Sequence, residues 1–204
     1  MDEYLVPTAF GEEEFVEKKS RFIGRIWPVE TEEEALQRIQ EMKKKHYDAT
    51  HNCWAYIIRD GAVRFSDDGE PGGTAGMPIM DTLIRSETLD AIIIVTRYFG
   101  GILLGSGGLV RAYSKSASDA LSSAGVLQML PCSEIEFFVD YSRYGGIEGF
   151  VRSNSTVKNT EFLDNIRFNC LVPFDDAEGF IAEIIERTDG RSSPKIISEE
   201  YLAK

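Results

Sequence analysis

Three acidic side chains and a histidine are the residues of this sequence whose types could support catalysis or metal binding. Asp67, Asp68 and Glu70 lie close together, and His51 precedes them by 16 residues. Carboxylate oxygens bind Mg²⁺ and Ca²⁺, and a histidine can act as a general base. The carboxylates do not occupy the alternate positions of a calcium-binding loop. We therefore expect them to accept hydrogen bonds from backbone amides or arginines in a turn, and we predict no metal and no cofactor.

His51 and Cys53 are the second pair of residues that could form a catalytic site. They alternate along an expected strand over residues 51–59, so their side chains share one face of it. Their separation is too large for contact between a nucleophile and a base. We predict no catalytic residues, and a hydrolase that uses His51 with Asp67, Asp68 and Glu70 is the alternative hypothesis.

The glycines could bind an anion through the backbone. Nine of the eighteen glycines lie between Gly69 and Gly108, and glycine permits positive φ and the close approach of a ligand. An expected strand over 90–99 leads through glycines into an expected helix that ends at Ala124, an order that resembles phosphate-binding loops. Neither GxxxxGK[ST] nor GxGxxG is complete, so the sequence does not support a nucleotide-hydrolysing site.

We predict that the two glycine-rich stretches form a binding face for an anion, an RNA backbone or a partner's carboxylate. Arginine side chains would supply charge, and amides near residues 105–108 would supply fixed hydrogen-bond donors. The competing interpretation is that the glycines only allow the helix to pack closely on the sheet. The predicted face consists of His51, Asp67, Asp68, Glu70, Thr74, Arg97, Gly100, Gly101, Gly105, Gly107, Gly108 and Arg111.

The elements that would position this face follow from hydrophobic patterns. Thr31 and Glu34 form a capping box that starts a helix, in which Glu34 is expected to reach back to the amide of Thr31. Five consecutive apolar residues over 91–95 predict a central strand that is buried on both faces. The pattern breaks at Leu130-Pro131-Cys132, so we expect domains over 1–130 and 131–204. The second has the order βαββαβ of a ferredoxin-like sandwich, with elements over 134–140, 143–152, 157–163, 166–172, 175–188 and 195–200.

Several motifs resemble the YigZ/IMPACT family. They are SDDGEPGGTAGMP, IIIVTRYFGGILLGSGGLVRAY, Lys19-Ser20-Arg21-Phe22, Ala49-Thr50-His51 and Cys53-Trp54-Ala55-Tyr56, and together they span about residues 18–120. The resemblance implies an α+β protein of two domains. The first would be an α/β sandwich like a domain of a small-subunit ribosomal protein, and the second would be like the last domain of elongation factor G.

The same resemblance implies a function in binding and regulation. The eukaryotic branch of the family regulates translation, so the implied partners are the ribosome, RNA or a translation-related protein. A protein-partner regulator without nucleic-acid contact is a further hypothesis, which the acidic composition favours.

Composition limits the possible partners. The net charge is −12, and acidic residues exceed basic ones by six in both 1–130 and 131–204. Tight binding to duplex DNA needs clustered cations, so we predict none. No apolar run is long enough to span a bilayer. The start of the sequence does not resemble a signal peptide, and the three cysteines form no CxxC pair. We therefore expect a cytoplasmic protein without membrane contact.

Overall fold

The computed structural model describes residues 2–204. It contains two five-stranded sheets with helices packed on them, which confirms the predicted α+β class with two domains. One compact unit consists of residues 4–128, here called the first unit. The other, the second unit, consists of residues 129–204 together with residues 2–3. No helix within residues 2–204 is both long enough and apolar enough to cross a membrane.

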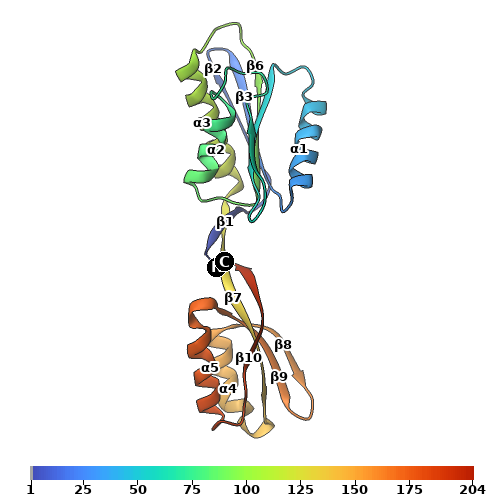
Figure 1. Ribbon diagram of the computed structural model, residues 1–204, viewed down its shortest axis with the longest axis vertical. Helices are drawn as coiled ribbons and strands as arrows, with labels where there is room; N and C mark the ends of the chain where they lie inside the picture. The colour runs from blue at the N-terminus through green and yellow to red at the C-terminus, as the bar shows by residue number, and fades with distance from the viewer. Residues whose placement is uncertain (1) are drawn as a thin grey trace. The chain divides into compact units, whose positions relative to one another are not determined.

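The first unit is a sheet between two layers of helices. Figure 1 shows α2 and α3 on one face of this sheet and α1 on the other. The strand order is β2-β3-β6-β4-β5, and all neighbouring strands are antiparallel. The elements are β2 (Gly11–Glu17), β3 (Ser20–Pro28), α1 (Glu32–Lys45), β4 (His51–Ile57), β5 (Val63–Ser66), α2 (Gly76–Arg85), β6 (Ala91–Tyr98) and α3 (Ser106–Ala124).

Strand β6 is central and buried on both faces, as its apolar run predicts. Ile93 and Val95 belong to the core beneath α2 and α3, whereas Ile92 and Ile94 belong to the core beneath α1. Alternating side chains of a strand point to opposite faces, so each of these four residues fills one of the two cores. Strand β6 also pairs with β3 on one edge and with β4 on the other, which holds the end of β6 and the loop that follows in place.

The helices of the first unit begin in different ways. In α1 the Thr31 hydroxyl accepts a hydrogen bond from the Glu34 amide at 3.2 Å. The Glu34 carboxylate accepts from the Glu30 amide at 2.8 Å, and not from Thr31 as the sequence suggested. Helix α3 begins after Gly105 without a side-chain cap and without an acidic residue in its first turn. Its positive end is therefore not neutralised by its own residues.

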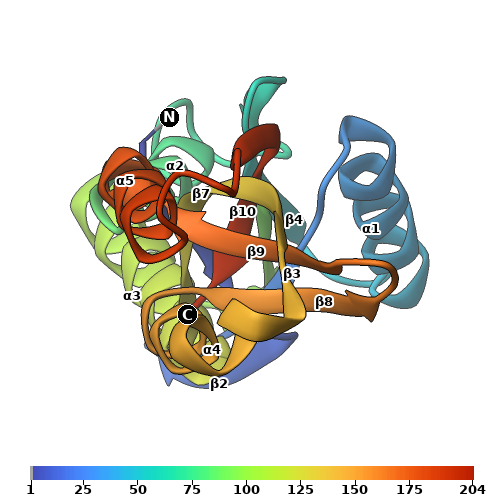
Figure 2. The same ribbon diagram turned by 90° about the horizontal axis from the view of Figure 1, so that it is seen from below.

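The second unit has the predicted βαββαβ order. Its strands are arranged β8-β9-β7-β10. Figure 1 shows α4 and α5 on one face of this sheet, and Figure 2 shows β8 and β9 running alongside each other. The elements are β7 (Val126–Val139), α4 (Tyr141–Asn154), β8 (Thr156–Phe162), β9 (Ile166–Pro173), the 3-10 helix η1 (Phe174–Asp176), α5 (Ala177–Arg187) and β10 (Lys195–Ala203), whereas β1 (Tyr4–Pro7) belongs to residues 4–128.

The expected break at Leu130-Pro131-Cys132 is wrong as a statement about secondary structure. Strand β7 continues through it, and Pro131 pairs with Tyr201 of β10. Pairing of β7 with β9 starts one residue later, at Cys132. Pro131 therefore lies inside the β7–β10 ladder, with paired residues on both sides of it, and just outside the β7–β9 ladder.

Candidate functional site

The site starts with a cross-strand pair. His51 is the first residue of β4, and Arg97 lies opposite it on β6. Phe22 of β3 lies opposite Arg97 on the other side. Directly opposed side chains on one face of an antiparallel pair are close enough to interact. The sheet therefore brings a histidine and an arginine together beside the loop after β6.

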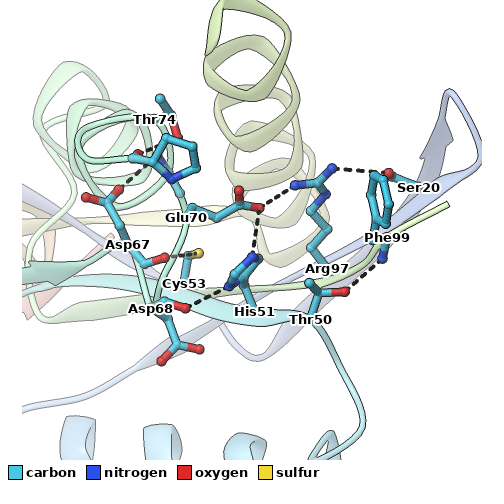
Figure 3. A network of polar contacts seen from close by, with 12 residues as sticks. Ser20, Thr50, His51, Cys53, Asp67, Asp68, Glu70, Thr74, Arg97 and Phe99 are labelled. Atoms are coloured by element: carbon cyan, nitrogen blue, oxygen red, sulfur yellow. Dashed lines mark hydrogen bonds and ion pairs between the residues drawn. The ribbon is translucent and has the colours of Figure 1, made fainter. Parts of the chain in front are cut away.

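Glu70 comes from the loop between β5 and α2 and completes the cluster. Its Oε1 lies 2.5 Å from Nη1 of Arg97 and accepts a hydrogen bond from the Tyr113 hydroxyl at 2.8 Å. Figure 3 shows His51, Glu70 and Arg97 pointing toward one another. Arg97 also donates to the Ser20 hydroxyl at 3.3 Å. Hence Arg97, expected to be a solvated binding residue, is a buried structural cation that is 5% exposed.

Asp67 organises the loop that carries Glu70. Its carboxylate accepts hydrogen bonds from the amides of Gly73, Ala75 and Gly76 at 2.8–3.0 Å. Burial raises the pKa of Asp67, but these three amides outweigh that effect and hold the pKa below its ordinary value. Thr74 is buried, and its hydroxyl donates to the Pro71 carbonyl. The carboxylate thus caps α2 from outside the helix, which confirms the expected bonding to turn amides.

Asp68 points away from Glu70 and makes separate contacts (Figure 3). Its carboxylate accepts hydrogen bonds from the Asn52 amide and from the Lys43 ammonium, both at 2.7 Å. Since the three carboxylates diverge, they do not form one ligand set. Across residues 2–204, no group of three or more His, Cys, Asp or Glu side chains is placed to hold a metal ion.

The orientation of His51 is set by the backbone. Its Nδ1 lies 2.8 Å from the carbonyl oxygen of Asp68. A carbonyl can only accept, so Nδ1 carries the proton and donates it. Nε2 then lies 3.9 Å from Oε1 of Glu70. In the neutral imidazole Nε2 is therefore free to accept a hydrogen bond.

Cys53 lies beneath this cluster and is not arranged as a nucleophile. Its thiol donates to the Asp67 carbonyl at 3.0 Å. Burial raises the pKa of the Cys53 thiol far above its ordinary value. A thiol must lose its proton to attack a substrate, so this environment suppresses its reactivity.

A pocket of about 380 Å³ opens above the His51–Glu70–Arg97 cluster; we call it the Phe99 pocket. Phe99, Leu103, Leu104 and Leu109 give it apolar walls, and Gly105 and Ser106 bring the start of α3 to its edge. The Arg97 guanidinium lies 5.6 Å from the Phe99 ring centroid, within the range of a cation–π contact. The pocket thus combines apolar walls with a few convergent polar groups, as ligand sites do.

A smaller hollow of about 160 Å³, which Leu104 also lines, is here called the basic groove. Lys18, Arg111 and Lys115 line it together with Glu17. Lys115 pairs with Asp119, whereas Lys18 and Arg111 form no ion pair within the described chain. The groove therefore presents a local excess of positive charge in a protein that is acidic as a whole.

Glycines shape the loop between the two hollows. A Cβ on Gly100 would lie 2.0 Å from the carbonyl carbon of Lys19, so only glycine allows the loop to contact the β2–β3 turn. Gly105 has φ +74, and Gly101 has φ +81. Gly107 and Gly108 lie in the first turn of α3, and a Cβ on Gly107 would lie 3.5 Å from the Arg111 guanidinium.

The structure thus divides the predicted face into three groups. His51, Glu70, Arg97 and Gly105 line the Phe99 pocket, and Gly108 and Arg111 line the basic groove. The third group does not line either hollow and consists of Asp67, Asp68, Thr74, Gly100, Gly101 and Gly107.

Sequence reasoning missed four residues near the site. Ser20 accepts hydrogen bonds from Arg97 and Gly100, and Thr50 accepts one from the Phe99 amide. No polar role was predicted for Tyr113 of α3, although its hydroxyl donates to Glu70. A buried tyrosine hydroxyl normally has a partner, which was the available signal for its bond to Glu70. Nothing in the sequence indicated that Lys18 lines the basic groove, because Lys18 lies in the β2–β3 turn, far along the chain from Arg111 and Lys115 of α3.

A larger hollow lies elsewhere, within the second unit. It measures about 1160 Å³ beside α5 and is lined by Phe150 and Phe180 with the acidic residues Asp175, Asp176, Glu183 and Glu186. Of the cationic side chains in the described chain, only Lys204 lines it. Its acidic lining does not fit the anion-binding chemistry that the glycine-rich face suggests.

Two family models match the chain. The Impact N-terminal domain matches residues 18–121, and a domain of unknown function, DUF1949, matches residues 137–191. The first match contains the Phe99 pocket and all but Phe15 and Glu17 of the basic groove.

Relatives match over nearly the whole chain. The IMPACT family member YvyE of Bacillus subtilis is 41% identical over 98% of this chain and 94% of its own length. The IMPACT family member YigZ of Escherichia coli is 32% identical over 93% of this chain and 96% of its own. The Protein IMPACT homolog of Dictyostelium discoideum is 34% identical over 65% of this chain and 39% of its own. A solved structure described as a hypothetical protein matches with a TM-score of 0.61 and 30% identity, covering 97% of this chain and 98% of that one.

Proposed function

Since the chain belongs to the IMPACT family, we propose that it is a non-enzymatic regulatory protein that binds a component of translation, the ribosome or RNA, through its glycine-rich face. The observation that carries this proposal is the open start of α3. There the helix lacks both a cap and an acidic residue, and Lys18 and Arg111 lie beside it without ion pairs. Free amides, a helix dipole and unpaired cations together favour an anionic partner.

The remaining polar groups support binding over chemistry. Arg97 and Glu70 neutralise each other, and the Cys53 thiol is buried and protonated. A hydrolase would need an activated nucleophile or water beside His51, and hydrolysis by the carboxylates would need them to converge. They diverge instead, so the proposal assigns them to holding the loop in place.

Co-sedimentation with ribosomes tests this proposal. Lysates containing the tagged wild-type protein, or the Lys18→Ala/Arg111→Ala double variant, would be separated on sucrose gradients at low and physiological salt. We expect the wild type to migrate with ribosomal particles and the double variant to shift to the top of the gradient. Each lost charge-assisted hydrogen bond should cost about 1.5–3 kcal/mol of association.

The matched control is Lys195→Ala, which removes an exposed cation from β10 in the second unit. It should migrate as the wild type does. Wild-type protein that stays in the free pool at both salt concentrations would refute the association with ribosomes.

A further inference from the structure

The Phe99 pocket and the basic groove are neighbours that share a lining residue. Leu104 lines both hollows, and α3 begins immediately after it. Gly105 and Ser106 lie at the pocket, whereas Gly108 lies at the groove. A ligand that crosses the start of α3 would therefore reach both hollows at once.

The start of α3 has the donors for one anionic group. Within the described chain, the amides of Ser106, Gly107 and Gly108 have no hydrogen-bond partner, and the first amide with one is that of Leu109, which bonds to the Gly105 carbonyl. Arg111 lies one turn further along, and its guanidinium is near Gly107. A phosphate oxygen fits such a group of amides beside a cation.

Arg97 provides a second and independent indication of a ligand. It is 5% exposed and lines the Phe99 pocket, yet its Nε has no hydrogen-bond partner. An unsatisfied donor on a buried cation is costly, and because this Nε is shielded from solvent, an acceptor in the pocket would relieve that cost through a small shift of the Arg97 side chain. His51 adds Nε2, which can accept a hydrogen bond from a ligand. The pocket therefore suits a ligand that has both an apolar face and polar edges.

A nucleobase has these properties. The Phe99 side chain is 46% exposed and offers a ring for stacking, and Leu103 is 82% exposed at the rim. Bases stack on exposed aromatic side chains when they are not held in a duplex. The positive charge of the groove beside the pocket favours a polyanion over an uncharged peptide, because Lys18 and Arg111 have no acidic partners.

We propose that this face binds single-stranded RNA, with one unpaired base in the Phe99 pocket, its phosphate on the amides at the start of α3, and the next phosphate in the basic groove. This inference rests on the proposed function, in that both use the glycine-rich face, but it names the ligand class and the nucleotide subsite. Duplex RNA does not fit because its bases are stacked and paired, and its strand cannot place one in the pocket.

The test measures binding of the full chain to fluorescein-labelled octamers by fluorescence anisotropy between 50 and 200 mM KCl. The probes are single-stranded RNA, the same strand in a duplex, and single-stranded DNA of the same sequence. We expect the Phe99→Ala variant to bind single-stranded RNA roughly 5- to 140-fold more weakly, the range of one lost stacking contact. Arg111→Ala should make the negative slope of log K against log salt shallower by about 0.7, the value for one phosphate of a single strand.

Matched controls and a second variant keep the test decisive. Phe162→Ala removes a 59% exposed phenylalanine from the second unit, and Lys195→Ala removes an exposed cation there. Both should bind as the wild type does. Leu103→Ala changes the most exposed part of the rim, so it tests the pocket if Phe99→Ala disturbs folding, and we expect weaker binding from it as well.

Several outcomes would overturn the inference. These are equal binding of duplex and single strand, unchanged binding by both pocket variants, or no binding of single-stranded RNA at 50 mM KCl. Tighter binding of DNA than of RNA would reassign the site to single-stranded DNA. If ribosome association still depends on Lys18 and Arg111 while the octamers do not bind, the proposed function holds and the nucleotide subsite is wrong. Ribosome association lost by Phe99→Ala without any octamer binding would assign the pocket to a protein side chain.

Discussion

Glu70 and Arg97 form an ion pair with 2.5 Å between Oε1 and Nη1, and their side chains are only 3% and 6% exposed. Because Tyr113 donates to the same carboxylate oxygen, the pair is part of a buried network that joins the loop after β5, strand β6 and helix α3. Glu70 and Arg97 of this network line the Phe99 pocket. The positive charge of Arg97 is neutralised by the Glu70 carboxylate. The excess positive charge of the glycine-rich face must therefore come from other residues.

Arg97→Ala should destabilise the fold strongly, because it leaves the Glu70 carboxylate buried without a partner. We expect a loss of roughly 3–5 kcal/mol in the free energy of unfolding, measured by urea denaturation. Arg111→Ala, an exposed arginine without an ion pair, should change it by less than about 0.5 kcal/mol.

A double variant separates the ion pair from packing. Arg97→Met with Glu70→Gln removes both charges and retains an acceptor for Tyr113, so it should recover most of the lost stability. Equal losses in Arg97→Ala and Arg111→Ala would contradict the buried role of Arg97.

Gly100→Ala should also destabilise the first unit. The added Cβ would lie 2.0 Å from the backbone of Lys19, which forces the β2–β3 turn or the loop after β6 to move. We expect a loss of about 1–3 kcal/mol by thermal or urea denaturation, as for other overpacked sites.

The control for this glycine is Gly72→Ala. A Cβ there meets no atom within 4 Å, and its φ lies outside the left-handed region. It should be close to neutral, and a larger loss from Gly72→Ala than from Gly100→Ala would contradict the packing argument.

The fold was predictable from the sequence to a large extent because its signals are local or periodic. The apolar run of β6, the Thr31 cap of α1 and the glycine that ends α3 each act within a few residues. The βαββαβ order of the second unit was predictable because its strands and helices are separate, recognisable patterns along the sequence. The strand that continues through Pro131 was missed, since a proline inside an apolar pattern reads as a break unless its place in the ladder is known.

The site was less predictable because its contacts join distant segments. Sequence reasoning placed Arg97 at the end of a strand but could not see that Glu70, 27 residues earlier, would bury its charge. Nor does the sequence indicate that Lys43, in the last turn of α1, pairs with Asp68 of the loop after β5. The basic groove joins Lys18 in a turn to Arg111 in α3, and no spacing in the sequence indicates that proximity.

Asp67 should make stability depend on pH in acid. Its pKa in the folded protein lies below the ordinary value, so its contribution is complete above about pH 4 and is lost as the pH falls through the folded pKa. Asp67→Asn removes the charge that the three amides face, and we expect it to lose about 1.5 kcal/mol at pH 7.

The difference between the wild type and Asp67→Asn should shrink as the pH falls from 5 toward 2.5, since the wild-type carboxylate then becomes protonated. Urea denaturation at several pH values measures it. Asp60→Asn, at an exposed turn position with positive φ that asparagine tolerates, is the control. A constant difference across this pH range would show that the charge of Asp67 is not what holds the loop.

The cysteines should be unreactive in the folded protein. Burial raises the pKa of Cys53, Cys132 and Cys170, so little thiolate is present at pH 8. We would measure this with an aromatic disulfide reagent, whose thiolate product absorbs light when a cysteine displaces it. It should detect less than about one thiol within minutes in native protein, and all three thiols in urea. Rapid stoichiometric modification of Cys53 would reopen a role for it as a nucleophile.

The last prediction separates binding from hydrolysis at the same cluster. His51 holds its Nδ1 proton on the Asp68 carbonyl, and Cys53, the nucleophile closest to it in sequence on that face, is bonded to the Asp67 carbonyl. If the protein binds and does not hydrolyse, any turnover of ester, phosphoester or peptide substrates by purified protein should be equal in wild type, His51→Ala and Asp68→Asn. Arg111→Ala should instead weaken ribosome association while its melting temperature stays within about 1–2 °C of the wild type. The opposite pattern would establish the hydrolase. In that case His51→Ala and Asp68→Asn would be folded but would abolish the turnover of a substrate. Arg111→Ala would keep that turnover and would still bind every partner. Melting curves of all four proteins, recorded in the same buffer as the assays, distinguish lost chemistry from lost folding.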